Sequence, residues 1–112
     1  MRKLLPLVLL AALAGTLLVA APALSKRKSV EVDDNYFVRK GSPPTVSVSR
    51  NDTVKWEWEG RNPHNVTVTR GPVKFHSRTQ RSGDYSKKMT RSGTYKIVCT
   101  IHAGMKMTLR VR

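Results

Sequence analysis

Hydrophobic and polar residues alternate along most of the chain after residue 29. Short runs rich in Val, Thr, Tyr and Trp are separated by Gly, Pro, Asn and Ser, which is the pattern of β-strands joined by turns. We predict strands at 30–33, 45–49, 53–59, 65–69, 85–89, 93–99 and 107–112, with a short piece at 36–38. Short strands at this spacing favour an all-β fold, a β-sandwich.

The alternation also assigns faces, because successive side chains of a strand point to opposite sides of the sheet. Val54, Trp56 and Trp58 share one face of their strand, so we expect them in the core. In the strand at 93–99 the face that carries Tyr95 and Ile97 also carries Cys99. This places the sulfur inside the protein, at the end of a buried row.

The N-terminal segment predicts export. Arg2 and Lys3 precede an uncharged apolar run at 4–24 that contains Ala21-Pro22-Ala23, and this pattern is typical of a signal peptide. We expect a signal peptide at 1–24 and one domain at 25–112, located in the periplasm or secreted. A run of about 20 residues also suits an uncleaved anchor, which would be the only contact with a membrane. Residues 26–29 are then interpreted as a basic leader to the first strand.

The charge is strongly positive, with 21 Lys and Arg against 7 Asp and Glu and a formal net charge of +14. The basic residues are dispersed over turns and strand faces, without a recognition helix or an aromatic-basic RNA-binding motif, so we predict no nucleic-acid partner. A field of this sign attracts acidic partners. A chain of 112 residues has room for one core. Because it has neither a Ser/His/Asp set nor paired carboxylates, we expect no enzyme activity.

A single cysteine is unusual in an exported protein. Cys99 cannot form an internal disulfide, and a free thiol outside the cytoplasm is exposed to oxidation. The thiol is therefore either buried and inert or a metal ligand.

Two segments hold candidate metal ligands. Cys99-Thr100-Ile101-His102-Ala103-Gly104-Met105 places a thiolate, an imidazole and a thioether just where a strand gives way to a loop, and Asn62-Pro63-His64-Asn65-Val66 supplies a second imidazole. Soft sulfur with imidazole suits copper, and two His with one Cys form a trigonal site to which Met adds a weak axial ligand. Asn65 is placed to hydrogen-bond across to the other ligand loop. His76 lies outside both segments, and we expect it on an exposed loop.

These two segments, with Gly93-Thr94-Tyr95 ahead of the cysteine, resemble the cupredoxins, above all plastocyanin and amicyanin, and the resemblance extends over residues 30–111. It implies a Greek-key β-sandwich of seven to eight strands and one type 1 copper ion held by His64, Cys99 and His102. Two methionines compete for the axial position. Met105 has the amicyanin-like spacing from His102 and Met107 the plastocyanin-like one. Met107 shares its parity with core residues of the last strand, so we favour Met105.

The resemblance implies a one-electron carrier whose copper cycles between Cu(II) and Cu(I). We expect a monomer that exchanges electrons with an acidic redox partner through His102, near the protein surface. Two alternatives remain open. One is an extracytoplasmic protein that binds and delivers copper in copper homeostasis, and the other is a cationic β-sandwich interaction module without metal.

Overall fold

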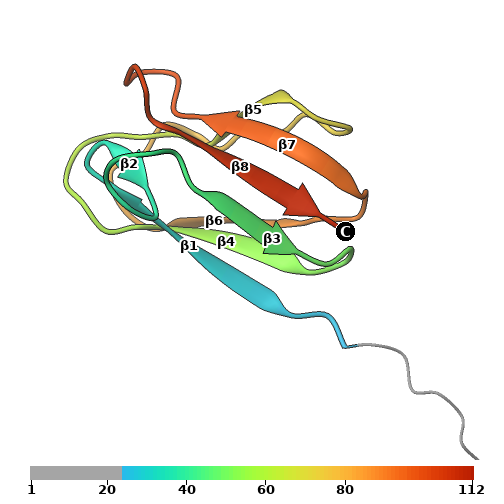
Figure 1. Ribbon diagram of the computed structural model, residues 1–112. Helices are drawn as coiled ribbons and strands as arrows, with labels where there is room; N and C mark the ends of the chain where they lie inside the picture. Colours follow the sequence, from blue (N-terminus) through green and yellow to red (C-terminus); the bar gives the residue numbers. More distant parts are fainter. Residues whose placement is uncertain (1–23) are drawn as a thin grey trace, which may run out of the picture.

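The computed structural model describes residues 24–112, and these residues form a sandwich of two four-stranded sheets (Figure 1). The first sheet has the strand order β2-β1-β4-β6 and the second has the order β3-β8-β7-β5. The strands are β1 (Arg27–Asp33), β2 (Tyr36–Phe37), β3 (Thr45–Val48), β4 (Thr53–Trp58), β5 (Thr67–Arg70), β6 (Asp84–Lys88), β7 (Gly93–Val98) and β8 (Lys106–Val111). The predicted all-β sandwich is thereby confirmed.

Both sheets are mixed. β1 runs parallel to β4 and β3 runs parallel to β8, whereas the other neighbours are antiparallel. The central pair of the second sheet, β7 and β8, is in register from Gly93 opposite Val111 to Val98 opposite Lys106. Cys99 follows β7 directly and Met105 directly precedes β8. The pair therefore holds both ends of the C-terminal ligand loop side by side at the same end of the sheet.

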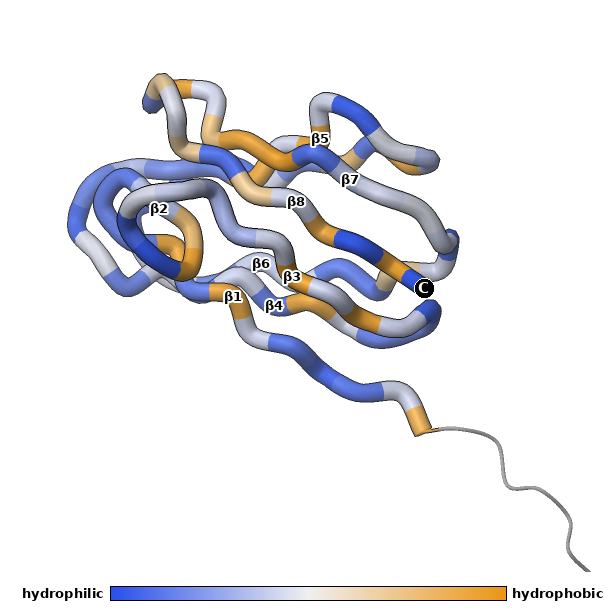
Figure 2. The backbone as a smooth tube through the Cα atoms, viewed as in Figure 1, coloured by the Kyte–Doolittle hydropathy of each residue, from blue (hydrophilic) through white to orange (hydrophobic). Residues whose placement is uncertain are grey.

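The core lies between the sheets and follows the predicted faces. Val54, Trp56 and Trp58 are buried on the inner side of β4, and Tyr95 and Ile97 on the inner side of β7. Figure 2 shows the underlying alternation of hydrophobic and hydrophilic residues along the strands. Cys99 continues the buried row of β7 and is 3% exposed, so the thiol lies in a dry environment.

The strand bounds differ from the prediction by one or two residues at several ends, and by three at the start of β1. Residues 27–29, interpreted above as part of a leader, are in β1, where Arg27 to Ser29 pair with Thr53 to Lys55 of β4. All three side chains are exposed, because this part of β1 has a neighbouring strand on one side only and lies beyond the core. The alternation that marks a half-buried strand is therefore missing from the sequence at this point.

The predicted export segment lies, up to residue 23, outside the described residues. Within residues 24–112 we find no helix with the length and hydrophobicity needed to cross a membrane.

Candidate metal centre

His64 is held by the loop between β4 and β5. Its backbone N–H donates to the carbonyl of Gln80 and its carbonyl accepts from the N–H of Gln80, both at 3.0 Å. This antiparallel bridge fixes the backbone of the histidine against the loop between β5 and β6. The side chain is fully buried, so the imidazole has one defined position inside the protein.

Cys99 and His102 lie on the loop that joins β7 to β8. The N–H of Cys99 donates to the carbonyl of Met105 at 3.0 Å, and the N–H of Met105 donates to the carbonyl of His102 at 3.2 Å. Gly104 has a φ of +81°, in the left-handed region that glycine adopts without steric cost. This tight turn folds His102 back towards the sulfur of Cys99.

The three side chains converge on one point. Nδ1 of His64 is 3.1 Å from Nδ1 of His102, and Sγ of Cys99 is 3.5 Å from Nδ1 of His102 and 4.0 Å from Nδ1 of His64. These atoms form a group, with all separations within 4.8 Å, that could hold a metal ion. The described residues thus bring together an imidazole from one loop with a thiol and an imidazole from another.

Asp34 fixes the orientation of His64 from the opposite side. Its carboxylate lies 2.9 Å from Nε2 of His64 and also accepts the backbone N–H groups of Arg61 and Asn62 at 2.9 Å. The Arg61 N–H, followed by the His64 imidazole and the Asn62 N–H, lowers the pKa of Asp34 to about 2. With its proton on Nε2 and donated to this carboxylate, His64 presents the lone pair of Nδ1 to the site.

Gly60 makes room for this carboxylate. A Cβ at Gly60 would overlap the side chain of Asp34, so the absence of a side chain at position 60 allows Asp34 to approach the loop that carries His64.

Asn65 joins the two ligand loops. Its Nδ2 donates to Oγ1 of Thr100 at 2.8 Å, and its Oδ1 accepts the backbone N–H of Thr100 at 3.1 Å. Two further bonds, to the hydroxyls of Thr79 and Thr67, hold the amide in place. Thr100 is next to Cys99, so Asn65 sets the distance between the histidine of one loop and the cysteine of the other.

The family model for copper binding proteins of the plastocyanin/azurin family matches residues 27–112. The chain belongs to this family. Plastocyanin from Prochlorothrix hollandica is 31% identical over 103 residues, covering 84% of this chain and 79% of that protein.

Solved structures share the fold of this plastocyanin/azurin-family protein. The copper-containing nitrite reductase of Thermus scotoductus SA-01 matches with a TM-score of 0.68 and 25% identity over 86% of this chain, but this chain spans only 25% of the reductase. A point mutant of amicyanin in its oxidised state matches with a TM-score of 0.65 and 26% identity, covering 77% of this chain and 82% of amicyanin.

The donor set of this family member fits its cofactor, copper. A thiolate and two imidazole nitrogens are the ligands that copper favours in trigonal sites, and the three donor atoms already face one another, with His64 and Cys99 buried and His102 half-buried. Exclusion of water protects the thiolate from oxidation and strengthens its electrostatic interaction with a bound cation.

The two methionines occupy different places. Met107 lies in β8 opposite Ile97 and is buried in the core, as its parity predicts. Met105 precedes β8, on the loop that carries Cys99 and His102, and is also buried. Met107 therefore has a packing role that accounts for its burial, whereas Met105 lies in the ligand loop itself.

The ligand loop also reaches the surface. Residues 98–106 line a shallow hollow that includes Cys99, His102 and Met105. His102 is half-buried, and its neighbour Ile101 is 49% exposed. The imidazole of His102 is thus the part of the site closest to solvent, beside an exposed apolar side chain.

Sequence reasoning named the three donor residues and Asn65 but missed Asp34. Asp34 is separated from His64 by 30 positions and lies in the turn between β1 and β2, so no local motif marks it. His76, in contrast, is exposed and outside the donor group, as expected.

Proposed function

We propose that this protein is an extracytoplasmic one-electron carrier that holds one copper ion through His64, Cys99 and His102, with Met105 as the axial ligand. The observation that supports this proposal is the convergence of two Nδ1 atoms and one Sγ atom within 3.1 to 4.0 Å. Bound copper supplies the redox couple Cu(II)/Cu(I). Membership of the plastocyanin/azurin family and the likeness to plastocyanin support the carrier role.

The protein residues supply rigidity around the metal. His64 is held by its bridge to Gln80 and by Asp34, and Asn65 links its loop to the loop of Cys99. A donor set that keeps its positions in both oxidation states lowers the rearrangement needed for electron transfer. His102, half-buried beside Ile101, offers the shortest path from the donor group to a partner at the surface.

The experiment is the addition of one equivalent of Cu(II) to the purified protein. We expect an intense blue absorption band from the bond between the thiolate and copper, and a reversible one-electron wave in voltammetry. Cys99→Ser should abolish the band, whereas the matched variant His76→Ala should keep it. A blue protein that gives no reversible wave but passes its copper readily to a Cu(I) chelator would instead support copper delivery.

The axial assignment has its own test. Met105→Leu should raise the reduction potential while the protein stays blue, because a weak thioether donor to the metal is lost. Met107→Leu should leave the potential unchanged and cost less than about 1.5 kcal/mol of stability, as expected for a core replacement of similar volume. A shift of the potential in Met107→Leu but not in Met105→Leu would assign the axial role to Met107.

A further inference from the structure

Charge is divided unequally between the two sheets. All seven carboxylates lie in β1, β4 or β6 or directly next to the ends of these strands: Glu31, Asp33, Asp34, Asp52, Glu57, Glu59 and Asp84. The strands of the other sheet, β3, β5, β7 and β8, contain none. The outer face of this sheet instead carries exposed basic side chains, which we call the basic face: Arg70, Lys96, Lys106 and Arg110.

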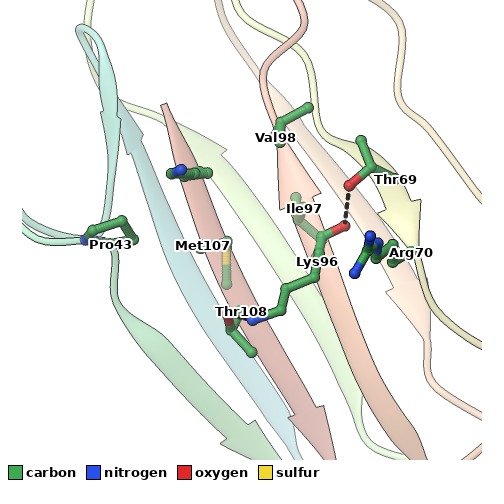
Figure 3. A pocket seen from close by; sticks show the side chains of 9 residues that line it. Pro43, Thr69, Arg70, Lys96, Ile97, Val98, Met107 and Thr108 are labelled. Atoms are coloured by element: carbon green, nitrogen blue, oxygen red, sulfur yellow. Dashed lines mark hydrogen bonds between the residues drawn. The ribbon is translucent and has the colours of Figure 1, made fainter. Parts of the chain in front are cut away.

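The basic face has a groove at its centre. The groove has a volume of about 380 Å³, and Arg70, Lys96, Lys106 and Thr108 are among the residues that line it. Figure 3 shows Lys96 extending across to Thr108, with Arg70 on its other side. The ammonium group of Lys96 donates to Oγ1 of Thr108 at 3.1 Å. The groove thus has polar donors on both flanks and a floor made by the sheet.

The positive charges of the basic face repel one another. Arg70 of β5 is the direct cross-strand partner of Lys96 of β7, and like charges in this position destabilise a sheet. Among residues 24–112 no basic side chain of this face has an ion-pair partner, whereas Lys55 on the other sheet contacts Glu57 at 3.4 Å and Asp84 at 3.9 Å. An anionic surface laid on the basic face would relieve this repulsion.

The basic face is continuous with the metal centre. Val98 and Lys106 line both the groove and the hollow of the ligand loop. Val98 precedes Cys99 directly, and His102 lines the same hollow. A partner seated over the groove can therefore extend over the adjoining loop to the half-buried imidazole of His102 and the exposed side chain of Ile101.

We propose that the basic face is the docking surface for an acidic redox protein, which presents carboxylates to Arg70, Lys96 and Lys106 while its redox group faces His102. The proposal rests on the proposed carrier function and adds the surface that the partner uses. Complementary charge accelerates the encounter and fixes its orientation. Arg70, Lys96 and Lys106 supply cationic donors to the carboxylates of such a partner, and the hydroxyl of Thr108 lies in the same groove.

The test is an NMR titration of the Cu(I)-loaded protein with a ten-residue glutamate peptide at low ionic strength. We expect amide shifts in β5, β7, β8 and residues 98–106. In Arg70→Glu/Lys96→Glu the affinity should fall about tenfold or more, equivalent to about 1.4 kcal/mol. The control Lys28→Glu/Lys88→Glu, with the same change of net charge on β1 and β6, should lose much less. Arg70→Glu/Lys96→Glu keeps a pair of like charges across the strands, so we expect the repulsion between these two positions to be no greater than in the wild type.

Three results would overturn the docking surface: equal loss of affinity in both double variants, shifts centred on β1 and β6, or localised binding to phosphatidylglycerol vesicles without localised binding to the peptide. The last result would assign the basic face to a membrane. The carrier function fails separately, through a colourless Cu(II) adduct or an irreversible voltammetric wave. Because both double variants leave His64, Cys99 and His102 intact, they should remain blue and redox-active whichever result the titration gives.

Discussion

At the scale of single residues, the position of one proton decides whether His64 serves as a ligand. An imidazole has two nitrogens, and the hydrogen bond made by one sets the chemistry of the other. The carboxylate of Asp34, 2.9 Å from Nε2, favours the proton on that nitrogen and leaves Nδ1 for the metal. Asp34 is itself held by the N–H groups of Arg61 and Asn62, so the orientation of the ligand depends on a residue in a different turn.

Replacing this carboxylate should weaken the site. In Asp34→Asn we expect the affinity for Cu(II) to fall about 10–100-fold, the usual effect of losing a partner of a ligating histidine. The reduction potential should rise, because a ligand without an anionic partner donates less electron density to Cu(II). Competition with a Cu(II) chelator and voltammetry measure the two effects.

The control for this prediction is Glu59→Gln. It removes the same charge from an exposed position next to the end of β4 and should change neither quantity appreciably. If Asp34→Asn folds and binds Cu(II) as tightly as Glu59→Gln at the same potential, Asp34 has no positioning role.

At the scale of secondary structure, the hydrophobic pattern was sufficient wherever a strand has one buried face. Val54, Trp56 and Trp58 alternate with polar residues, and they are buried as predicted. The pattern failed at residues 27–29, where both faces are exposed and pairing with β4 alone makes the strand. The alternation of hydrophobic and polar residues reflects the burial of one face. A strand segment that extends beyond the core has no buried face, so its sequence does not alternate.

The donor group could be predicted for a related reason. Cys99 ends the buried row of β7, and Cys99 and His102 are only three positions apart, so local spacing was informative. The contact of His64 with Asp34 depends instead on how the turn after β1 meets the loop after β4. Such contacts between loops follow from the packing of whole elements, which periodicity does not describe.

The start of β1 is anchored by Asp52, which precedes β4. Its carboxylate accepts the backbone N–H of Lys26 at 2.9 Å and that of Ser49 at 2.8 Å, and these bonds, that of Lys26 foremost, lower its pKa. A group with a lowered pKa in the folded state stabilises the fold above its ordinary pKa, and this contribution is lost as the pH falls through the folded value. The anchor therefore weakens in acid.

We expect Asp52→Asn to lower the thermal midpoint of the metal-free protein at pH 7. The difference from the wild type should shrink as the pH falls from about 5 towards 2, because the wild type then loses the same charge. Glu31→Gln, on β1, is the matched control: desolvation and then the neighbouring Asp33 raise the pKa of Glu31, so removal of its charge should not destabilise the protein at pH 7. Thermal melts over this pH range test both variants, and a difference for Asp52→Asn that does not vary with pH would exclude the acid-sensitive anchor.

At the scale of the whole molecule, two features meet at one end of the sandwich. The core between the sheets ends at the row that carries Cys99, and the basic face of the second sheet runs up to the same loop. The inner side of β7 therefore leads to the metal, and its outer side leads to the proposed partner. β7 therefore connects the redox site to the proposed docking surface, because Val98 at its end lines both the groove and the hollow of the ligand loop.

The metal centre should also contribute to the stability of the whole fold. Its donors come from the loop between β4 and β5, which crosses from the first sheet to the second, and from the loop between β7 and β8, so a bound ion ties this crossover to the C-terminal ligand loop. A ligand at a hundredfold excess over its Kd adds about 2.7 kcal/mol to the folded state, and in a domain of this size each kcal/mol raises Tm by about 4–8 °C.

Under these conditions Cu(II) should raise the Tm of the wild type by roughly 10–20 °C. Cys99→Ser at the same copper concentration should gain much less, because a hydroxyl is a poor ligand for this metal, whereas His76→Ala, which removes an exposed histidine outside the donor group, should gain as much as the wild type. Calorimetric melts of the three proteins with and without copper measure these changes of Tm. An equal rise in all three would mean that copper binds to the surface, and that the link between the two loops through His64 and Cys99 contributes nothing to folding.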